Sequence, residues 1–173
     1  ALSSAASDVY KRQIIIKIFL EVGVMKIAIG CDHGAFRLKN EIIEFLNSEN
    51  YEVKDFGTYS EESCDYPDIA LPVAEAVVNK EYDFGILVCG TGIGIGIAAN
   101  KVPGVRAALC SDTFSAHATR EHNNANILTM GQRVVGTGLA LDIVKTFLNT
   151  EFEGERHQKR IDKISEIEKK YSK

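Results

Sequence analysis

The chain has 173 residues, of which 45% are hydrophobic and 25% are charged, and its formal net charge is −4 at pH 7. This length suits a single domain with a sizeable core, and the composition is that of a globular chain rather than a disordered or fibrous one. The acidic balance argues against a nucleic acid or an anionic membrane as partner, because either would select a basic surface.

Four cysteines, Cys31, Cys64, Cys89 and Cys110, are scattered without C-x-x-C spacing. No convincing secretory signal precedes them, so we interpret them as reduced thiols and predict a cytoplasmic protein. Cys31 and Cys110 fall near predicted strand ends, with His33 close to the first, but a second closely spaced ligand pair is missing. We therefore predict no disulfide, no metal site and no cofactor.

The first 24 residues differ from the rest of the chain. Their apolar run at 14–24 is interrupted by Lys17 and Glu21 and is shorter than the roughly 20 residues of a membrane span. A strong strand pattern begins at Met25. We predict that 1–24 is a leader, a non-native extension, and that 25–173 is a single domain. The alternative is a genuine extra strand or helix that docks on the domain.

From Met25 onward, apolar runs alternate with helical patterns. The run at 26–32 is continuous, as in a strand buried on both faces, and a helix with the apolar face Leu38, Ile42, Phe45 and Leu46 follows it. Further strands are predicted at 51–57, 84–89, 105–110 and 126–130. Further helices are predicted at 69–79, with Pro67 at its start and Pro72 in its first turns, at 93–101, 113–122 and 137–149, and at the C-terminus, along Ile161, Ile164, Ile167 and Tyr171.

This alternation predicts an α/β fold, a Rossmann-like three-layer sandwich with a five-stranded parallel sheet and a C-terminal helix, because parallel strands need crossover connections. In such open sheets ligands bind in the crevice beyond the carboxyl ends of the strands. The positions selected by that rule are Asp32 and His33, Cys89 with the glycines after it, Ser111 and Asp112, and 131–133.

The stretch after Cys89 has glycine at every second position, at 90, 92, 94 and 96. Glycine accepts positive φ and close approach, so successive N–H groups, backed by a helix N-terminus, can point at an anion. The same donors would stabilise a thiolate at Cys89, although a thiol that closes a buried strand is also compatible with an inert apolar role. Neither the dinucleotide fingerprint nor a Walker loop is matched, so nucleotide binding is kept only as an alternative.

Three other clusters carry candidate site residues. Asp32 and His33 could bind substrate, or serve as a helix cap and a surface histidine. The stretch "REHNNAN", 120–126, ends a predicted helix and is also typical of capping and turns. Arg156 and Arg160, four residues apart with His157 beside them, fit a phosphate clamp, and the alternative is a solvated helix face with glutamate partners.

Six stretches, in this order and spacing, resemble the ribose-5-phosphate isomerase B family, which also contains the allose- and galactose-6-phosphate isomerases. They are "IAIGCDHGAF", "DYPD", "CGTGIGIGIAANK", "REHNNAN", "GQRVVG" and "RHQKRI", and the resemblance covers 25–170. It implies a Rossmann-like sheet, a homodimer with active sites at the subunit interface, and interconversion of D-ribose 5-phosphate and D-ribulose 5-phosphate without a metal. Two dimers forming a tetramer is left open.

The resemblance also implies a role for each matching residue. Cys89 is the base, because the position of the glutamate used by another branch of the family is Ile95 here. Asp32, His33 and His122 would bind and open the sugar ring, and Tyr66 and Asn123 would contact the sugar. Thr91 and the amides of Gly90, Gly92, Ile93 and Gly94 would form the anion hole. The phosphate site would consist of Arg133, Arg156, His157 and Arg160.

Two alternatives to this function stay open. The same machinery could act on allose 6-phosphate or galactose 6-phosphate. A non-catalytic protein that binds a sugar phosphate or a nucleotide would share the glycine loop and the basic residues but would need no base.

Overall fold

The computed structural model describes residues 23–172, so the predicted leader, 1–24, lies almost wholly outside the described residues. The strands are β1 (Lys26–Cys31), β2 (Glu52–Asp55), β3 (Phe84–Cys89), β4 (Ala107–Leu109) and β5 (Ile127–Gly131). The helices are α2 (Phe36–Ser48), α3 (Tyr66–Val78), α4 (Ile93–Ala99), α5 (Thr113–Asn123), α6 (Thr137–Asn149) and α7 (Glu155–Tyr171), with a short 3-10 helix, η1 (His33–Ala35), before α2.

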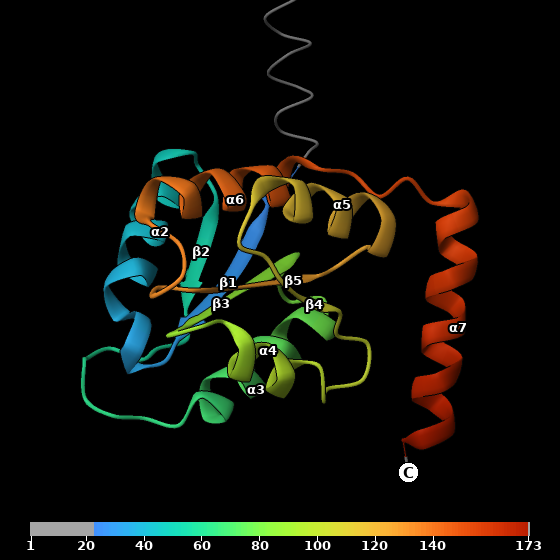
Figure 1. Ribbon diagram of the computed structural model, residues 1–173, viewed down its shortest axis with the longest axis horizontal. Coiled ribbons are helices and arrows are strands. Elements are labelled where there is room, and N and C mark those ends of the chain that lie inside the picture. Colours follow the sequence, from blue (N-terminus) through green and yellow to red (C-terminus); the bar gives the residue numbers. More distant parts are fainter. Residues whose placement is uncertain (1–22, 173) are drawn as a thin grey trace, which may run out of the picture.

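The five strands form one sheet in the order β2-β1-β3-β5-β4, and all neighbouring pairs are parallel. Helices α2, α5 and α6 cover one face of this sheet and α3 and α4 cover the other, while α7 stands beside the body (Figure 1). The predicted α/β sandwich with a parallel sheet and a C-terminal helix is therefore confirmed.

Strand side chains alternate between two apolar clusters, as the pleat requires. In β3, Ile86 and Val88 pack with α2, α5 and α6, whereas Leu87 and Cys89 pack with α3 and α4. Both faces of the central strands are buried, which explains why these strands read as continuous apolar runs. The alternation also decides that the Cys89 side chain lies on the face of the sheet that carries α4.

Several elements differ from their predicted bounds by one or two residues at an end, and the strand predicted at 51–57 is only Glu52–Asp55. The helix predicted at 69–79 begins at Tyr66, so Pro72 lies inside it rather than in its first turns. Pro67 lies at the first or second helical position, where its missing N–H has no intrahelical partner to lose. The strand predicted at 105–110 is only Ala107–Leu109, a short strand at the edge of the sheet that pairs with β5 alone.

The sheet has a topological switch point where the chain leaves β1 and β3. These two strands are neighbours, but the segment after β1 leads to α2 on one face and the segment after β3 leads to α4 on the other. Such a switch point is where open α/β sheets bind ligands. Among the described residues, no helix has the length and apolar character needed to cross a membrane.

Candidate functional site

The predicted site residues fall into two groups, each compact. The first group, which we call the thiol half-site, lies at the carboxyl ends of β1, β3 and β5 and at the start of α3; it consists of Asp32, His33, Tyr66, Cys89, Gly90, Thr91, Gly92, Ile93, Gly94 and Arg133. The second, the arginine half-site, lies at the end of α5 and the start of α7; it consists of His122, Asn123, Arg156, His157 and Arg160.

Cys89 is the last residue of β3, and its sulfur is the acceptor of a backbone hydrogen bond. The N–H of Gly92 points at Sγ from 3.0 Å. Gly92 has φ of 78°, which turns the chain back over the sulfur at the start of α4. The contact places a backbone donor against the sulfur at the point where α4 begins.

The Cys89 sulfur lies below the surface of the isolated chain. Only 4% of the residue is exposed, and its side chain packs in the cluster between the sheet and α3 and α4. Cys89 does not line any of four cavities found among residues 23–172. The Arg133 guanidinium lies against the neighbouring Gly90.

Two other cysteines have the inert character that was the alternative for Cys89. Cys31 is fully buried, and burial raises its pKa to about 12, partly offset by the Lys39 ammonium. Burial likewise raises the pKa of Cys110 to about 11. Both pack in the cluster with α2, α5 and α6, so neither joins the glycine loop. The metal alternative weighed for these two thiols and His33 gains no support from this packing.

Asp32 and His33 follow β1 directly, and each holds a nearby loop by a hydrogen bond from a backbone N–H. Asp32 is the N-cap of η1, accepting the Gly34 N–H at 2.9 Å, and it is 9% exposed. The capping role weighed as an alternative is therefore real. His33 accepts the N–H of Cys64 at Nδ1 from 3.2 Å, so a neutral His33 carries its hydrogen on Nε2.

The glycine loop is held against its neighbours by close backbone packing. The Arg133 N–H donates to the Gly90 carbonyl at 3.0 Å, and a Cβ on Gly94 would lie 2.8 Å from the Tyr66 ring. Thr91 accepts the Ile93 N–H with its hydroxyl at 3.3 Å, so its side chain supports the start of α4. The glycine loop is thus packed against Tyr66 at the start of α3 and bonded to Arg133 in the segment after β5.

The arginine half-site centres on two stacked histidines. The rings of His122 and His157 lie 4.4 Å apart between centroids with an interplanar angle of 13°. Arg160 donates to His157 Nδ1 at 3.1 Å, and His157 Nε2 lies 2.9 Å from the Glu153 carboxylate. Arg156 also approaches that carboxylate, at 3.6 Å.

His122, Glu153 and His157 also carry potential metal ligands, all within 4.8 Å of one another. Their geometry suits a cation poorly, because the lone pairs of nearly parallel rings do not converge on one point. Arg156 and Arg160 add two positive charges beside His157. The cluster is therefore better suited to an anion such as a phosphate.

The two half-sites lie at opposite edges of the sheet. Helix α5 starts beyond the carboxyl end of β4 and returns to the amino end of β5, which brings His122 and Asn123 to that end. Cys89 lies at the carboxyl end of β3. In Figure 1, β1 and β3 run toward the lower left while α7 stands at the right. One copy of the chain does not bring the two groups together.

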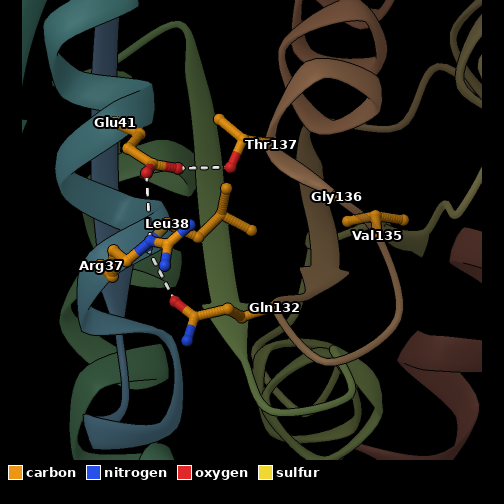
Figure 2. Close-up of a pocket in the computed structure, with 7 residues that line it drawn as sticks. All are labelled: Arg37, Leu38, Glu41, Gln132, Val135, Gly136 and Thr137. Carbon is orange, nitrogen blue, oxygen red and sulfur yellow. Dashed lines mark hydrogen bonds and ion pairs between the residues drawn. The ribbon is translucent and has the colours of Figure 1, made fainter.

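A polar cavity of about 230 Å³ lies between the starts of α2 and α6 (Figure 2). Glu41 spans it, accepting from Thr137 Oγ1 at 2.6 Å and from Arg37 Nε at 3.2 Å. Gln132 closes one end, because its side chain accepts the Leu38 N–H at 2.8 Å. Glu41 on α2 is already hydrogen-bonded to Thr137 at the start of α6. We therefore interpret the residues that line this cavity as a contact that holds the two helices together.

Three residues that support the site were given no role by the sequence analysis. Gln132 ties the thiol half-site to α2 and donates its own N–H to the Cys89 carbonyl. Glu153 pairs with His157, and Glu121 with His122. The first of these pairs has the i, i+4 spacing of helical ion pairs, a signal that could have been used. The second joins adjacent residues, for which spacing gives no signal.

The fold and its switch point place the chain among doubly wound α/β proteins, whose ligands bind beyond the carboxyl ends of the strands. A protein-family model described as ribose/galactose isomerase matches residues 27–164. A putative sugar phosphate isomerase of Bacillus subtilis, YwlF, is 58% identical over 84% of this chain and 99% of its own length. Ribose-5-phosphate isomerase B of Escherichia coli is 52% identical over 84% of this chain and 97% of its own length.

Solved structures agree with these relatives. Ribose-5-phosphate isomerase B of Clostridium thermocellum superposes with a TM-score of 0.85 at 62% identity, covering 86% of this chain and all of that one. The enzyme of Mycoplasma genitalium with bound ribulose-5-phosphate has a TM-score of 0.80 at 46% identity, covering 84% and 97% of the two chains. The chain belongs to the ribose/galactose isomerase family, and it is an aldose–ketose isomerase.

Proposed function

We propose that the protein interconverts D-ribose 5-phosphate and D-ribulose 5-phosphate through an enediolate, with Cys89 as the base. The observation that carries this proposal is the sulfur of Cys89 at the switch point of the sheet, with the Gly92 N–H 3.0 Å away. The relatives named for this reaction, and the relative solved with ribulose-5-phosphate, support the choice of sugar.

The reaction moves one hydrogen between neighbouring carbons. The Cys89 thiolate takes the proton from C2 of the open-chain aldose, and the electron pair forms the C1–C2 double bond while O1 becomes negative. The thiol then returns the proton to C1 as a proton passes from O2 to O1. A weakly acidic carbon needs such a positioned base together with donors for the oxygen.

The glycine loop supplies those donors. The amides of Gly90, Gly92, Ile93 and Gly94 would hold the developing charge on O1, and loss of a single such donor typically costs on the order of 10²-fold in rate. The Gly92 and Ile93 N–H groups, which contact Cys89 Sγ and Thr91 Oγ1, would have to turn toward O1 to take part. Ile95, the position at which another branch of the family has a glutamate, is fully buried and apolar, which supports Cys89 as the base.

We further propose that the working unit is a homodimer in which the thiol half-site of one copy faces the arginine half-site of its partner. The distance between the two half-sites within one copy supports this arrangement. Large apolar side chains are also exposed beside both: Ile93, Ile97 and Leu109 near the first, and Ile164, Ile167 and Tyr171 along α7. Assembly of two dimers into a tetramer is not required by the site.

A Cys89→Ser variant tests the base. We expect ribulose 5-phosphate formation to fall by at least about 10³-fold, because a serine hydroxyl is a far weaker proton acceptor than a thiolate. Binding of inorganic phosphate should be retained, since the arginine half-site is untouched. Undiminished turnover in this variant removes the base assignment. Turnover that is the same with and without a chelator is expected for a reaction without a metal.

Mixing two inactive variants tests the shared site. Cys89→Ser leaves the arginine half-site intact, and Arg160→Ala, which should mainly raise KM, leaves the thiol half-site intact. A mixed dimer has one site with both native halves, so mixing should restore activity at a ribose 5-phosphate concentration where neither parent works. No recovery after mixing, with subunit exchange verified by native mass spectrometry, contradicts the interface site.

The alternatives make different predictions. An allose 6-phosphate or galactose 6-phosphate isomerase would show a higher kcat/KM for the six-carbon sugar than for ribose 5-phosphate. A non-catalytic binding protein would bind sugar phosphates but release no ribulose 5-phosphate. The predicted cytoplasmic location, and the absence of a nucleic-acid or membrane partner, stay predictions.

A further inference from the structure

Glu121 makes two histidine contacts through one oxygen. Its Oε2 lies 3.0 Å from Nε2 of His122 and 3.3 Å from Nε2 of His117, one turn earlier on α5. His117 is in turn anchored at Nδ1, 3.2 Å from Thr150 Oγ1 at the end of α6. Glu121 is only half-buried, so this contact faces a polar cavity of about 410 Å³ that His117 and Glu121 line with 149–153.

The contact with Glu121 favours one tautomer of His122. The Glu121 carboxylate lies 3.0 Å from Nε2 at ion-pair distance, and its oxygen repels a nitrogen lone pair, so hydrogen on Nε2 is favoured. A neutral His122 held in this way has its hydrogen on Nε2 and a free lone pair on Nδ1. Among the residues that the structure describes, His122 Nδ1 has no hydrogen-bond partner.

His117 holds the same carboxylate from the other side. The Thr150 hydroxyl donates to the Thr146 carbonyl at 2.7 Å, so its oxygen must accept from His117 Nδ1. The His117–Glu121 contact is then a hydrogen bond only when both nitrogens of His117 carry hydrogen. Glu121 thus lies between two rings, only one of which belongs to the arginine half-site.

The remaining charged neighbours of His122 belong to α7 and the turn before it. His157 stacks on the ring, the Glu153 carboxylate lies 2.9 Å from His157 Nε2, and Arg156 and Arg160 donate to the two nitrogens of His157. A ring nitrogen of His122 also lies within 4.8 Å of the Glu153 carboxylate, and its contact at 3.0 Å is the one with Glu121. Glu121 is therefore the residue, within the described part of the chain, that orients the His122 ring edge.

We propose that Glu121 is a positioning residue that holds His122 with Nε2–H toward the carboxylate and leaves Nδ1 to accept a proton when the sugar ring opens. This inference rests on the proposed function. Ring opening of the furanose needs the O1 proton removed, the C1–O4 bond broken and O4 protonated. His122 Nδ1 takes the proton from O1, C1 becomes the aldehyde carbon as the electron pair moves to O4, and the imidazolium gives the proton to O4. The Glu121 carboxylate balances the charge of the imidazolium between the two transfers.

A pair of reactions separates positioning from a structural role. Conversion of ribose 5-phosphate, which is mainly a furanose, needs ring opening. Exchange of the C1 hydrogen of ribulose 5-phosphate in deuterium oxide does not, because that ketose is open-chain; it needs only the Cys89 chemistry. For Glu121→Gln we expect the first rate to fall about 10- to 100-fold, in the range of acid–base assistance, and the second to stay within about twofold.

Two further variants serve as controls. Glu151→Gln removes an exposed carboxylate from the same cavity wall, and we expect both rates to be unchanged. His117→Ala leaves Glu121 without its second support, and ribose 5-phosphate conversion should fall by a smaller factor than in Glu121→Gln. Equal losses of both reactions in Glu121→Gln would mean a merely structural role and would overturn the inference.

A spectroscopic measurement decides the tautomer without any turnover. Ring ¹⁵N shifts of the full chain should give His122 as the Nε2–H form at neutral pH in the native protein, and a mixture of tautomers in Glu121→Gln. A mixture already present in the native protein overturns the inference. A failure of the proposed function would give a different result, because C1 exchange would then survive in Cys89→Ser. The tautomer measurement would still decide the role of Glu121 in that case.

Discussion

The backbone N–H of Gly92 lies 3.0 Å from the sulfur of Cys89, and this contact joins the end of β3 to the start of α4. It depends on the φ of 78° at Gly92, a left-handed conformation that glycine adopts without strain. A Cβ at this position would lie 2.6 Å from the Met130 backbone carbon and 2.6 Å from the Leu109 side chain. The turn that aims an amide at the thiol is therefore available to glycine only.

Gly92→Ala should disable the site. The added methyl meets backbone as well as a side chain, so the loop must move and the Gly92 N–H must leave the sulfur. We expect a loss of turnover of about 100-fold or more and a loss of stability of about 1–3 kcal/mol. Gly138→Ala is the matched control, since a Cβ there meets nothing and alanine is the better helix former. Similar kcat and denaturant midpoints for the two variants would contradict this account.

Gly94→Ala should act through Tyr66. The new Cβ would lie 2.8 Å from the Tyr66 ring, which belongs to a different helix and can shift away. We expect KM for ribose 5-phosphate to rise about tenfold, because a displaced ring loses its sugar contact. In Gly94→Ala/Tyr66→Ala the ring is gone, so the two changes should cost less than the sum of the single variants. Additive effects in this double-mutant cycle would show that the ring and Gly94 are not coupled.

The four cysteines should differ in reactivity. Burial raises the pKa of Cys31 to about 12 and that of Cys110 to about 11, so at pH 8 no more than about one in 10³ of these thiols is ionised. We expect iodoacetamide to modify Cys64 and Cys89 first, as measured by peptide mass spectrometry. Ribose 5-phosphate should slow modification of Cys89 alone. Early modification of Cys31 in the folded protein would argue against this order.

Glu41 should make the free energy of unfolding depend on pH in the acidic range. The Thr137 hydroxyl, and then the Arg37 guanidinium, lower the pKa of the Glu41 carboxyl below its ordinary value (Figure 2). A group whose pKa is lower in the folded state adds stability above its unfolded pKa, and that stability is lost as the pH falls through the folded pKa. The native protein should therefore exceed Glu41→Gln in unfolding free energy at pH 7, and the difference should shrink as the pH falls through the pKa of the folded Glu41 carboxyl. A difference that is constant with pH would rule out this linkage.

Periodicity and strand chemistry were enough to predict the fold. The sheet has the predicted five parallel strands, and the helix at 137–149 and the strand at 84–89 have the predicted bounds, because runs such as Phe84–Cys89 are apolar throughout and stand between clear helical stripes. The short edge strand Ala107–Leu109 was predicted too long, since its length depends on one partner, β5. The residues of β4 themselves do not show how many of them will form hydrogen bonds with β5.

Sequence alone also predicted candidate site residues at the ends of the strands, because a parallel sheet brings all its carboxyl ends to one edge. It could not show that His122 and Arg160 lie at the other edge, away from Cys89, or that Glu121 is shared by two histidines. Those relations depend on the direction in which α5 and α7 leave the sheet. Helix direction and side-chain contact are set by long-range packing, so only the tertiary structure decided them.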